Sequence, residues 1–126
     1  MASHPLTVAW KSFTPEFTDA AGLPATFGTP EGAWTYGAAS DLIETSGPAK
    51  IVIQAEALKG KIGFCLISED YSKLVSEQRL INPADGKTTV TLTFAAAKSP
   101  ARVLVRNYAD GGNAGEVRID AAELQA

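Results

Sequence analysis

The sequence has one cysteine and one histidine among its 126 residues, and this scarcity excludes several kinds of protein. One cysteine, Cys65, allows no internal disulfide bond, and together with His4 it supplies too few ligands for a zinc site. His4 is the only imidazole, so the chain holds no Ser-His-Asp catalytic triad. Cys65 lies in the apolar run GKIGFCLIS at 60–68, which favours a buried thiol over a catalytic one.

Long apolar runs and a strong charge of one sign are missing as well. No apolar stretch reaches the roughly 20 residues of a membrane-spanning helix, and the N-terminus lacks the apolar region of a secretory signal peptide. We therefore expect no membrane partner and a cytoplasmic location by default, either as the whole protein or as a module of a larger one. The formal net charge of −3 argues against nucleic acid as a partner, because binding to phosphates needs a basic surface.

What the sequence does have is apolar and polar residues in alternation, the period of a half-buried β-strand. Val90, Leu92 and Phe94 alternate with threonines, and Val103 and Val105 alternate with polar or larger neighbours. Turn-forming residues separate these segments, for example in NPADG at 82–86. The pattern predicts eight strands, at 6–12, 33–39, 49–58, 61–68, 77–81, 88–94, 102–106 and 115–119.

The fold class that follows is all-β. We predict one domain, residues 1–126, folded as a β-sandwich of jelly-roll type with about eight antiparallel strands, and a closed barrel is the alternative. A helix at 71–80 is disfavoured because turn signals flank it on both sides. The last residues, 120–126, either continue the final strand or form a frayed helical turn. The residues expected in the core are Ile62, Phe64, Val90, Leu92, Phe94, Val103, Val105, Val117 and Ile119.

The segment 13–32 has no periodicity but is rich in proline, glycine and aromatic residues. A loop of that length is uncommon in a compact domain unless it is functional or packed on the body. We expect it to wrap the sandwich and bury its rings. In the strand that follows, the alternation places Trp34, Tyr36 and Ala38 on one face.

Catalytic and metal-binding patterns are weak. Paired carboxylates are the only basis for an enzyme, with Glu56, Glu77 and Glu116 as first candidates, and solvated strand faces explain them better. We therefore expect no enzyme. We also expect no cofactor, with a structural calcium as the alternative, because no pair of oxygen ligands has the spacing of a known calcium loop. The pairs of oxygen ligands considered are Asp41 with Glu44, Glu69 with Asp70, and Asp110 with Asn113.

The strongest candidate for binding combines aromatic rings with planar polar groups. Sugar recognition uses apolar ring faces for C–H surfaces, and guanidinium or amide groups for hydroxyls. The alternative is structural: the two rings lie in the core, and the arginines pair with Glu116 across strands. The predicted ligand-binding residues are Trp34, Tyr36, Arg102, Arg106, Asn107, Asp110 and Asn113.

Three short motifs carry a resemblance to a known group of modules. They are W-x-Y at 34–36, G-x-I-G-x-x-L at 60–66 and V-x-V-R-N at 103–107. With these motifs, residues 33–120 resemble the small β-sandwich modules found beside FkbM-type methyltransferases and glycosyltransferases in bacteria. The resemblance implies a lectin-like, non-catalytic carbohydrate-binding module that binds a glycan as the accessory of a parent multidomain transferase. The alternative function is a structural or assembly module that forms a homo-oligomer, since exposed aromatic residues mark interfaces.

Overall fold

The structure is a computed structural model that describes residues 3–32, 34–44, 49–94, 100–107 and 113–125. These residues form ten strands in two five-stranded sheets, and every pairing is antiparallel. Sheet A contains β1 (Ser3–Pro5), β3 (Ala25–Thr29), β5 (Ala49–Lys59), β8 (Lys87–Phe94) and β10 (Gly115–Gln125). Sheet B contains β2 (Trp10–Ser12), β4 (Tyr36–Ser40), β6 (Ile62–Ser68), β7 (Arg79–Ile81) and β9 (Ala101–Asn107).

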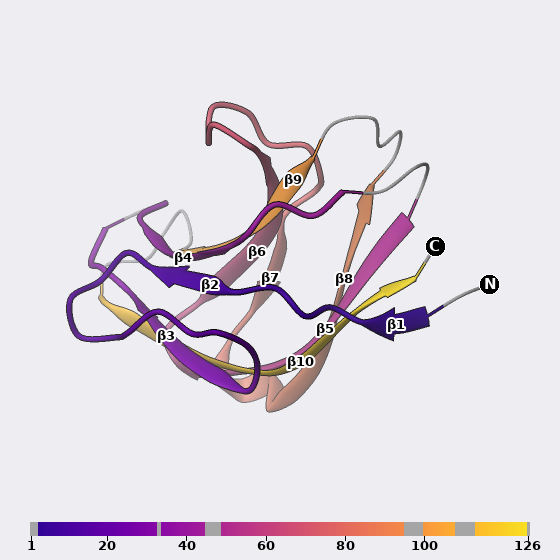
Figure 1. Cartoon of the computed structure of the whole chain (residues 1–126). Helices are drawn as coiled ribbons and strands as arrows, with labels where there is room; N and C mark the ends of the chain where they lie inside the picture. The colour runs from indigo at the N-terminus through magenta and orange to yellow at the C-terminus, as the bar shows by residue number, and fades with distance from the viewer. Residues whose placement is uncertain (1–2, 33, 45–48, 95–99, 108–112, 126) are drawn as a thin grey trace.

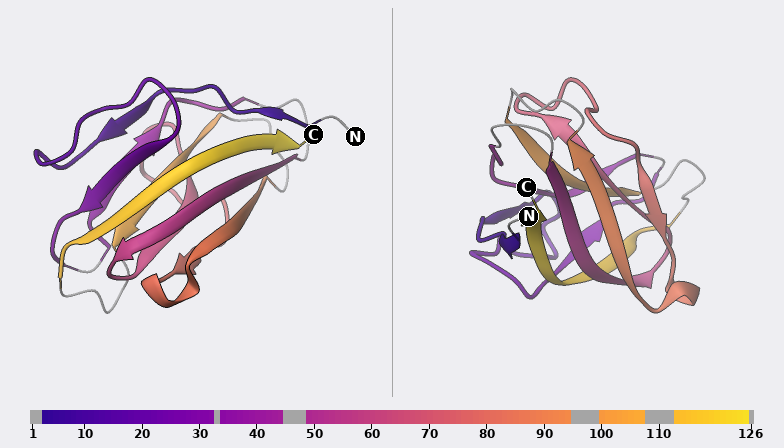
Figure 2. Two further views of the ribbon diagram at one scale, coloured as in Figure 1. Left: turned by 90° about the horizontal axis from the view of Figure 1, so that it is seen from below. Right: turned by 90° about the vertical axis from the view of Figure 1, so that its right-hand side faces the viewer.

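The two sheets face each other as the layers of a sandwich (Figure 1). Along sheet A the order is β1-β10-β5-β8, with β3 also pairing with β10, and along sheet B it is β2-β4-β9-β6-β7. From β3 to β6 and again from β7 to β10, each connection passes from one sheet to the other, which confirms the predicted β-sandwich of jelly-roll type. The first and last strands pair, with Ser3 opposite Gln125, so the two ends of the described chain lie side by side (Figure 2).

The one helix in the described residues is the short 3₁₀ turn η1 (Pro83–Asp85), so no helix there is long and apolar enough to cross a membrane. It lies in the NPADG turn that the sequence signals. Asn82 caps it by accepting a hydrogen bond from the Ala84 amide, while Asp85 accepts one from the Asn82 amide. The turn carries the chain from sheet B back to sheet A.

The core between the sheets confirms the predicted alternation. In β5, Ile51 and Ile53 are fully buried, while Lys50 and Gln54 are exposed on the outer face. The side chain of Phe94 lies outside the described part of the structure. The other residues expected in the core are all buried: Ile62, Phe64, Val90, Leu92, Val103, Val105, Val117 and Ile119.

One segment differs from the prediction, and for another the structure decides between the two predicted alternatives. The segment 13–32 is not irregular throughout, because β3 runs through it and pairs with β10, placing Phe27 opposite Val117 in the core. Glycines and prolines around this strand hide its periodicity, and only a distant strand supplies its partner. The tail continues β10 as far as Gln125, because β5 and β1 pair with it on both sides. This confirms the alternative in which residues 120–126 continue the final strand.

The predicted common face of Trp34, Tyr36 and Ala38 is wrong. Trp34 precedes β4, and the register of β4 shifts between Tyr36 and Ala38, so Ala38 faces the core while Tyr36 faces outward. Gly37 lies at this irregularity, against the backbone of Gly28, and a Cβ there would collide with the Gly28 carbonyl oxygen. Because of this close backbone approach, which alternation does not reveal, Tyr36 and Ala38 lie on opposite faces of sheet B.

Candidate functional site

The arginines predicted to bind a ligand lie together on the outer face of sheet B. In β9, Val103 and Val105 point into the core, while Arg102, Leu104 and Arg106 point outward. We call this surface the arginine face. Its members are Phe13, Tyr36, Tyr71, Arg102 and Arg106, with Trp34 and Gln78 at its margin.

The middle of the arginine face is apolar, although the sequence predicts a polar outer face for β9. Leu104 is fully buried although it shares the face of the two arginines. Three aromatic rings pack on the small cluster around it, with centroids 5.9–6.4 Å apart. The buried members of this cluster are Ala39, Cys65, Ile67 and Leu104, and the rings are Phe13, Tyr36 and Tyr71.

Arg106 is held at one end of the face by two neighbours. Its guanidinium carbon lies 4.2 Å from the centre of the Trp34 ring, a cation–π contact. Its Nε donates a 2.6 Å hydrogen bond to Gln78 Oε1. Gln78 reaches Arg106 by lying over Gly63 of β6, where a Cβ would come within 2.9 Å of Gln78 Oε1. The guanidinium is therefore fixed in place before any ligand arrives.

Arg102 is held in a similar way at the other end. Its guanidinium carbon lies 5.1 Å from the centre of the Tyr71 ring. Its Nε donates to the Glu69 carbonyl at 3.1 Å, and its Nη1 donates to the Ser40 carbonyl at 3.3 Å. Each arginine of the face thus lies against one aromatic ring.

The two rings that contact the arginines share an unusual backbone. Trp34 and Tyr71 both have φ of 63°, and no other residue except glycine has a positive φ in the described chain. A bulky residue in this left-handed region costs of the order of 1–3 kcal/mol, and such residues gather at functional sites. The surrounding turns must therefore hold both rings in place.

The turn before β4 holds Trp34. Thr35 Oγ1 donates to the carbonyls of Pro30 and Gly32 at 2.9 and 3.0 Å. The Thr35 carbonyl accepts the Asn107 amide at 2.9 Å, which ties the turn to the end of β9. Trp34 remains 40% exposed at the rim of the face.

The turn after β6 holds Tyr71. Asp70 Oδ1 accepts hydrogen bonds from Ser72 Oγ, Ser68 Oγ and the Ser72 amide, at 2.6, 2.9 and 3.1 Å. These bonds, the Ser72 hydroxyl first, hold the pKa of Asp70 below its usual value. The Tyr71 amide donates to the Ser68 carbonyl at 3.0 Å, which closes the turn under the ring.

The alternative that pairs the arginines with Glu116 is wrong. Glu116 belongs to sheet A, and among the described residues no carboxylate lies within 4 Å of Arg102 or Arg106. The arginines that form ion pairs there are Arg118, with Glu56 at 3.3 Å and Asp120 at 2.9 Å, and Arg79, with Glu77 at 3.5 Å.

The amide residues predicted with the arginines have a different environment. Asn107 is buried, and its Nδ2 donates to the carbonyls of Pro30 and Asn113 at 3.0 and 2.9 Å. It joins the Trp34 turn to the start of β10, whereas Asn113 is exposed beside it. Asp110 lies outside the described residues. Asn107 therefore positions the loop that carries Trp34.

Acidic residues do not converge in the part of the chain that the structure describes. No group of three or more His, Cys, Asp or Glu side chains is placed there to hold a metal ion. Of the calcium pairs, Asp70 is engaged in the Tyr71 turn, and Asp110 is not described. The structural calcium stays a prediction. Of the carboxylates considered for hydrolysis, Glu56 and Glu77 are ion-paired with arginines.

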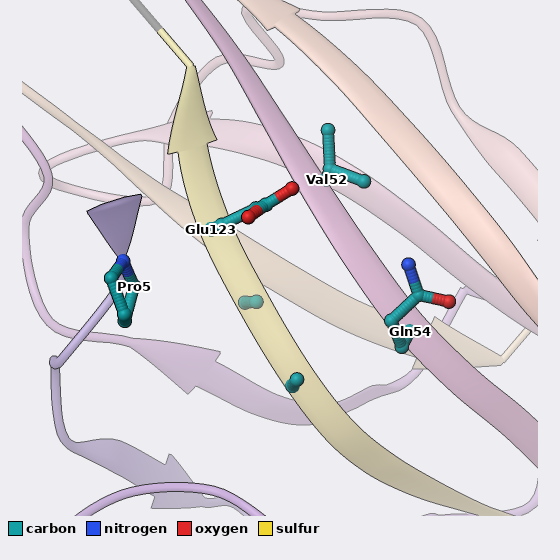
Figure 3. A pocket seen from close by; sticks show the side chains of 6 residues that line it. Pro5, Val52, Gln54 and Glu123 are labelled. Atoms are coloured by element: carbon teal, nitrogen blue, oxygen red, sulfur yellow. The ribbon is translucent and has the colours of Figure 1, made fainter. Parts of the chain in front are cut away.

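Three hollows on the described surface are lined by residues other than the predicted site residues. Figure 3 shows one of about 240 Å³ on the outer face of sheet A, where Val52 and Gln54 of β5 lie near Glu123 of β10 and Pro5 of β1. A larger one, of about 590 Å³, lies between the turns around Phe17 and Pro30. A hollow of about 460 Å³ between β7 and β8 adjoins the arginine face through Gln78.

Sequence reasoning missed Tyr71, Gln78 and Gly63 as parts of the face. Tyr71 and Gln78 both lie in the connection between β6 and β7, and each contacts an arginine of β9 about 30 positions later. The sequence signals the turn at Glu69–Ser72 but not the strand over which it folds. No local pattern indicates these contacts, because sheet pairing creates them.

Comparison with known proteins identifies the fold. No family model matches the chain, and no curated protein matches it. Among solved structures, the module BiXyn10A CBM1 is 12% identical over 78% of this chain and 69% of that chain, with a TM-score of 0.51. A Clostridium thermocellum xylanase 10B structure with CBM22-1 and GH10 modules is 11% identical over 98% of this chain and 26% of that chain, with a TM-score of 0.53. At these identities the likeness establishes a β-sandwich fold that carbohydrate-binding modules also have.

Proposed function

We propose that this protein is a non-catalytic carbohydrate-binding module and that its arginine face binds the glycan. The observation that carries the proposal is the pair of arginine–aromatic contacts, Arg106 with Trp34 and Arg102 with Tyr71. Both rings have a left-handed backbone, at a cost in stability that a purely structural surface does not require.

The chemistry of the face suits a sugar. An exposed indole offers an apolar surface to the C–H groups of a pyranose ring, and guanidinium N–H groups donate to its hydroxyls. Arg106 and Trp34 present both kinds of group at one place, and Gln78 already fixes the guanidinium. Because less side-chain freedom is lost on binding, this arrangement favours affinity.

One structural neighbour supports the same class of ligand. The Clostridium thermocellum xylanase 10B structure is a complex with xylohexaose. The sequence resemblance to modules beside FkbM-type transferases adds a predicted accessory role in a multidomain protein. No step of catalysis is assigned to this chain.

The test is binding of a panel of oligosaccharides by calorimetry at protein concentrations that detect millimolar affinity. We expect at least one hit, and Arg106→Ala should weaken it about tenfold to a hundredfold, because a hydrogen bond to a charged group contributes roughly 1.5–3 kcal/mol. The melting temperature should barely change. A panel without any hit, or an Arg106→Ala protein that binds normally, would contradict the proposal.

An assembly module is the second candidate, and one observation favours it. Leu74, Val75 and Leu80 are large apolar residues that are 39–40% exposed in or near β7, at the edge of sheet B. Exposed apolar residues beside an edge strand suit a contact between copies. Light scattering that finds only monomers at high concentration would exclude this function.

A further inference from the structure

We infer that the arginine face selects acidic glycans, with Arg106 binding the carboxylate of a uronic acid residue. The inference rests on the proposed function and narrows it to one class of sugar. It comes from the charge balance of the face and from the atoms of Arg106 that have no partner among the described residues.

The charge of the face is positive and is not neutralised locally. Arg102 and Arg106 have no carboxylate within ion-pair distance in the described chain, and Lys11 adds a third cation, 5.7 Å from the Phe13 ring. Two carboxylates lie in the chain between β6 and β7: Asp70 keeps its negative charge but accepts hydrogen bonds from Ser68 and Ser72 and not from an arginine, and Glu77 pairs with Arg79. The two arginines and Lys11 therefore leave the face with an excess of positive charge. Arg102 contacts backbone carbonyls and not acidic side chains.

The geometry of Arg106 leaves the right atoms for a carboxylate. Its Nε donates a hydrogen bond to Gln78, and the Trp34 ring stacks on the guanidinium. Among the described residues its two Nη atoms have no hydrogen-bond partner. They form the end of the planar fork, which binds the two oxygens of a carboxylate by parallel hydrogen bonds. A neutral hydroxyl cannot use both donors in this way.

The position of Trp34 indicates why the carboxylate belongs to a sugar. The guanidinium of Arg106 stacks over the Trp34 ring, and the indole is still 40% exposed. A pyranose ring packed on the exposed part of the indole would therefore place a carboxylate at C6 near the Nη atoms. Arg102 lies four residues along the same strand, roughly 13 Å away at the usual rise of a strand. It is therefore placed to contact a second sugar residue of the same chain.

The test compares ligands that are matched except at C6, where one member of each pair carries a carboxylate and the other a neutral group. Calorimetry would use β-1,4-linked tetraglucuronate against cellotetraose, and tetragalacturonate against its methyl ester. We expect the acidic member of at least one pair to bind about tenfold to a hundredfold more tightly at low salt, with the preference shrinking as salt rises. Arg106→Gln should abolish the preference without lowering the melting temperature. Lys50→Gln, which removes one exposed cation from sheet A, should leave it unchanged.

Each result is decisive. Equal binding of acidic and neutral partners would overturn the inference but leave the proposed function standing, whereas no binding of any sugar would overturn both. If the preference for the acidic ligand survives Arg106→Gln, residues other than Arg106 recognise the carboxylate, and the inference is overturned.

Discussion

Arg106 and Gln78, which lie 28 positions apart in the sequence, are joined by a 2.6 Å hydrogen bond across the outer face of sheet B. The bond passes over Gly63 of β6, the residue opposite Arg106 in the strand pairing. A larger residue at 63 would occupy the space of the Gln78 carboxamide. The absence of a side chain at Gly63 therefore lets Gln78, just before β7, orient the guanidinium of Arg106 in β9.

Gly63→Ala should disturb the orientation of the Arg106 guanidinium while leaving its charge unchanged. The new Cβ would lie 2.9 Å from Gln78 Oε1, so the flexible end of Gln78 must move and release Arg106. Since ordering a long side chain on binding costs about 0.5–1.5 kcal/mol, glycan affinity should fall roughly twofold to tenfold. The melting temperature should change little. Gly22→Ala, at a position with no atom within 4 Å, is the control, and equal affinity of both variants would refute this role for Gly63.

Trp34→Asn should remove the ring and keep the turn. Asparagine tolerates a positive φ better than other residues with side chains, so the fold should persist while glycan binding falls about tenfold or more. Trp34→Phe, which keeps a ring, should retain most of the affinity. Calorimetry with thermal melts checks both. If Trp34→Asn binds glycan normally, the rim of the face is not part of the site.

Phe27→Ala should test whether β3 belongs to the core. The side chain is fully buried against Trp10, with ring centroids 6.0 Å apart, so truncation should cost roughly 3–5 kcal/mol of the free energy of unfolding. Phe17→Ala, in the same segment but half exposed, should cost less. Urea denaturation measures both values. Equal small losses would mean that 13–32 lies on the sandwich as a loop.

Cys65 should make stability depend on pH in the alkaline range. Burial raises the pKa of its thiol above the ordinary value of 9.0, although the charge of Arg106 acts in the opposite direction. As pH rises through 9, the unfolded chain loses this proton first, so the free energy of unfolding should fall by up to about 1.4 kcal/mol per pH unit. Cys65→Ala should show a shallower decline in denaturation curves between pH 8 and pH 10.

The same burial should protect the thiol from reagents. In the folded protein Cys65 should react with a water-soluble alkylating reagent far more slowly than in urea, because its side chain is fully buried. Mass spectrometry of timed samples follows the labelling. Rapid modification under native conditions would show that the rings of the arginine face open readily.

Alternation predicts the sandwich because each strand packs one face on the core. This local rule places Ile62, Phe64, Val103 and Val105 correctly and separates Arg102 and Arg106 from the core. The rule fails where a strand pairs with a partner far away in the sequence or where its pairing is interrupted. β3 has no alternating pattern of its own, and the irregularity at Gly37 places Tyr36 and Ala38 on opposite faces of sheet B.

The sequence alone therefore determined the all-β fold, most of its core, and the placement of two arginines on one side of a strand. Only the tertiary structure decided what those arginines contact. Trp34, Tyr71 and Gln78 reach β9 through turns and strand pairing that join positions about 30 to 70 apart in the chain. The physical reason is that periodicity reports which side of a strand is buried, whereas the neighbours on that side depend on which strands pair and in which register.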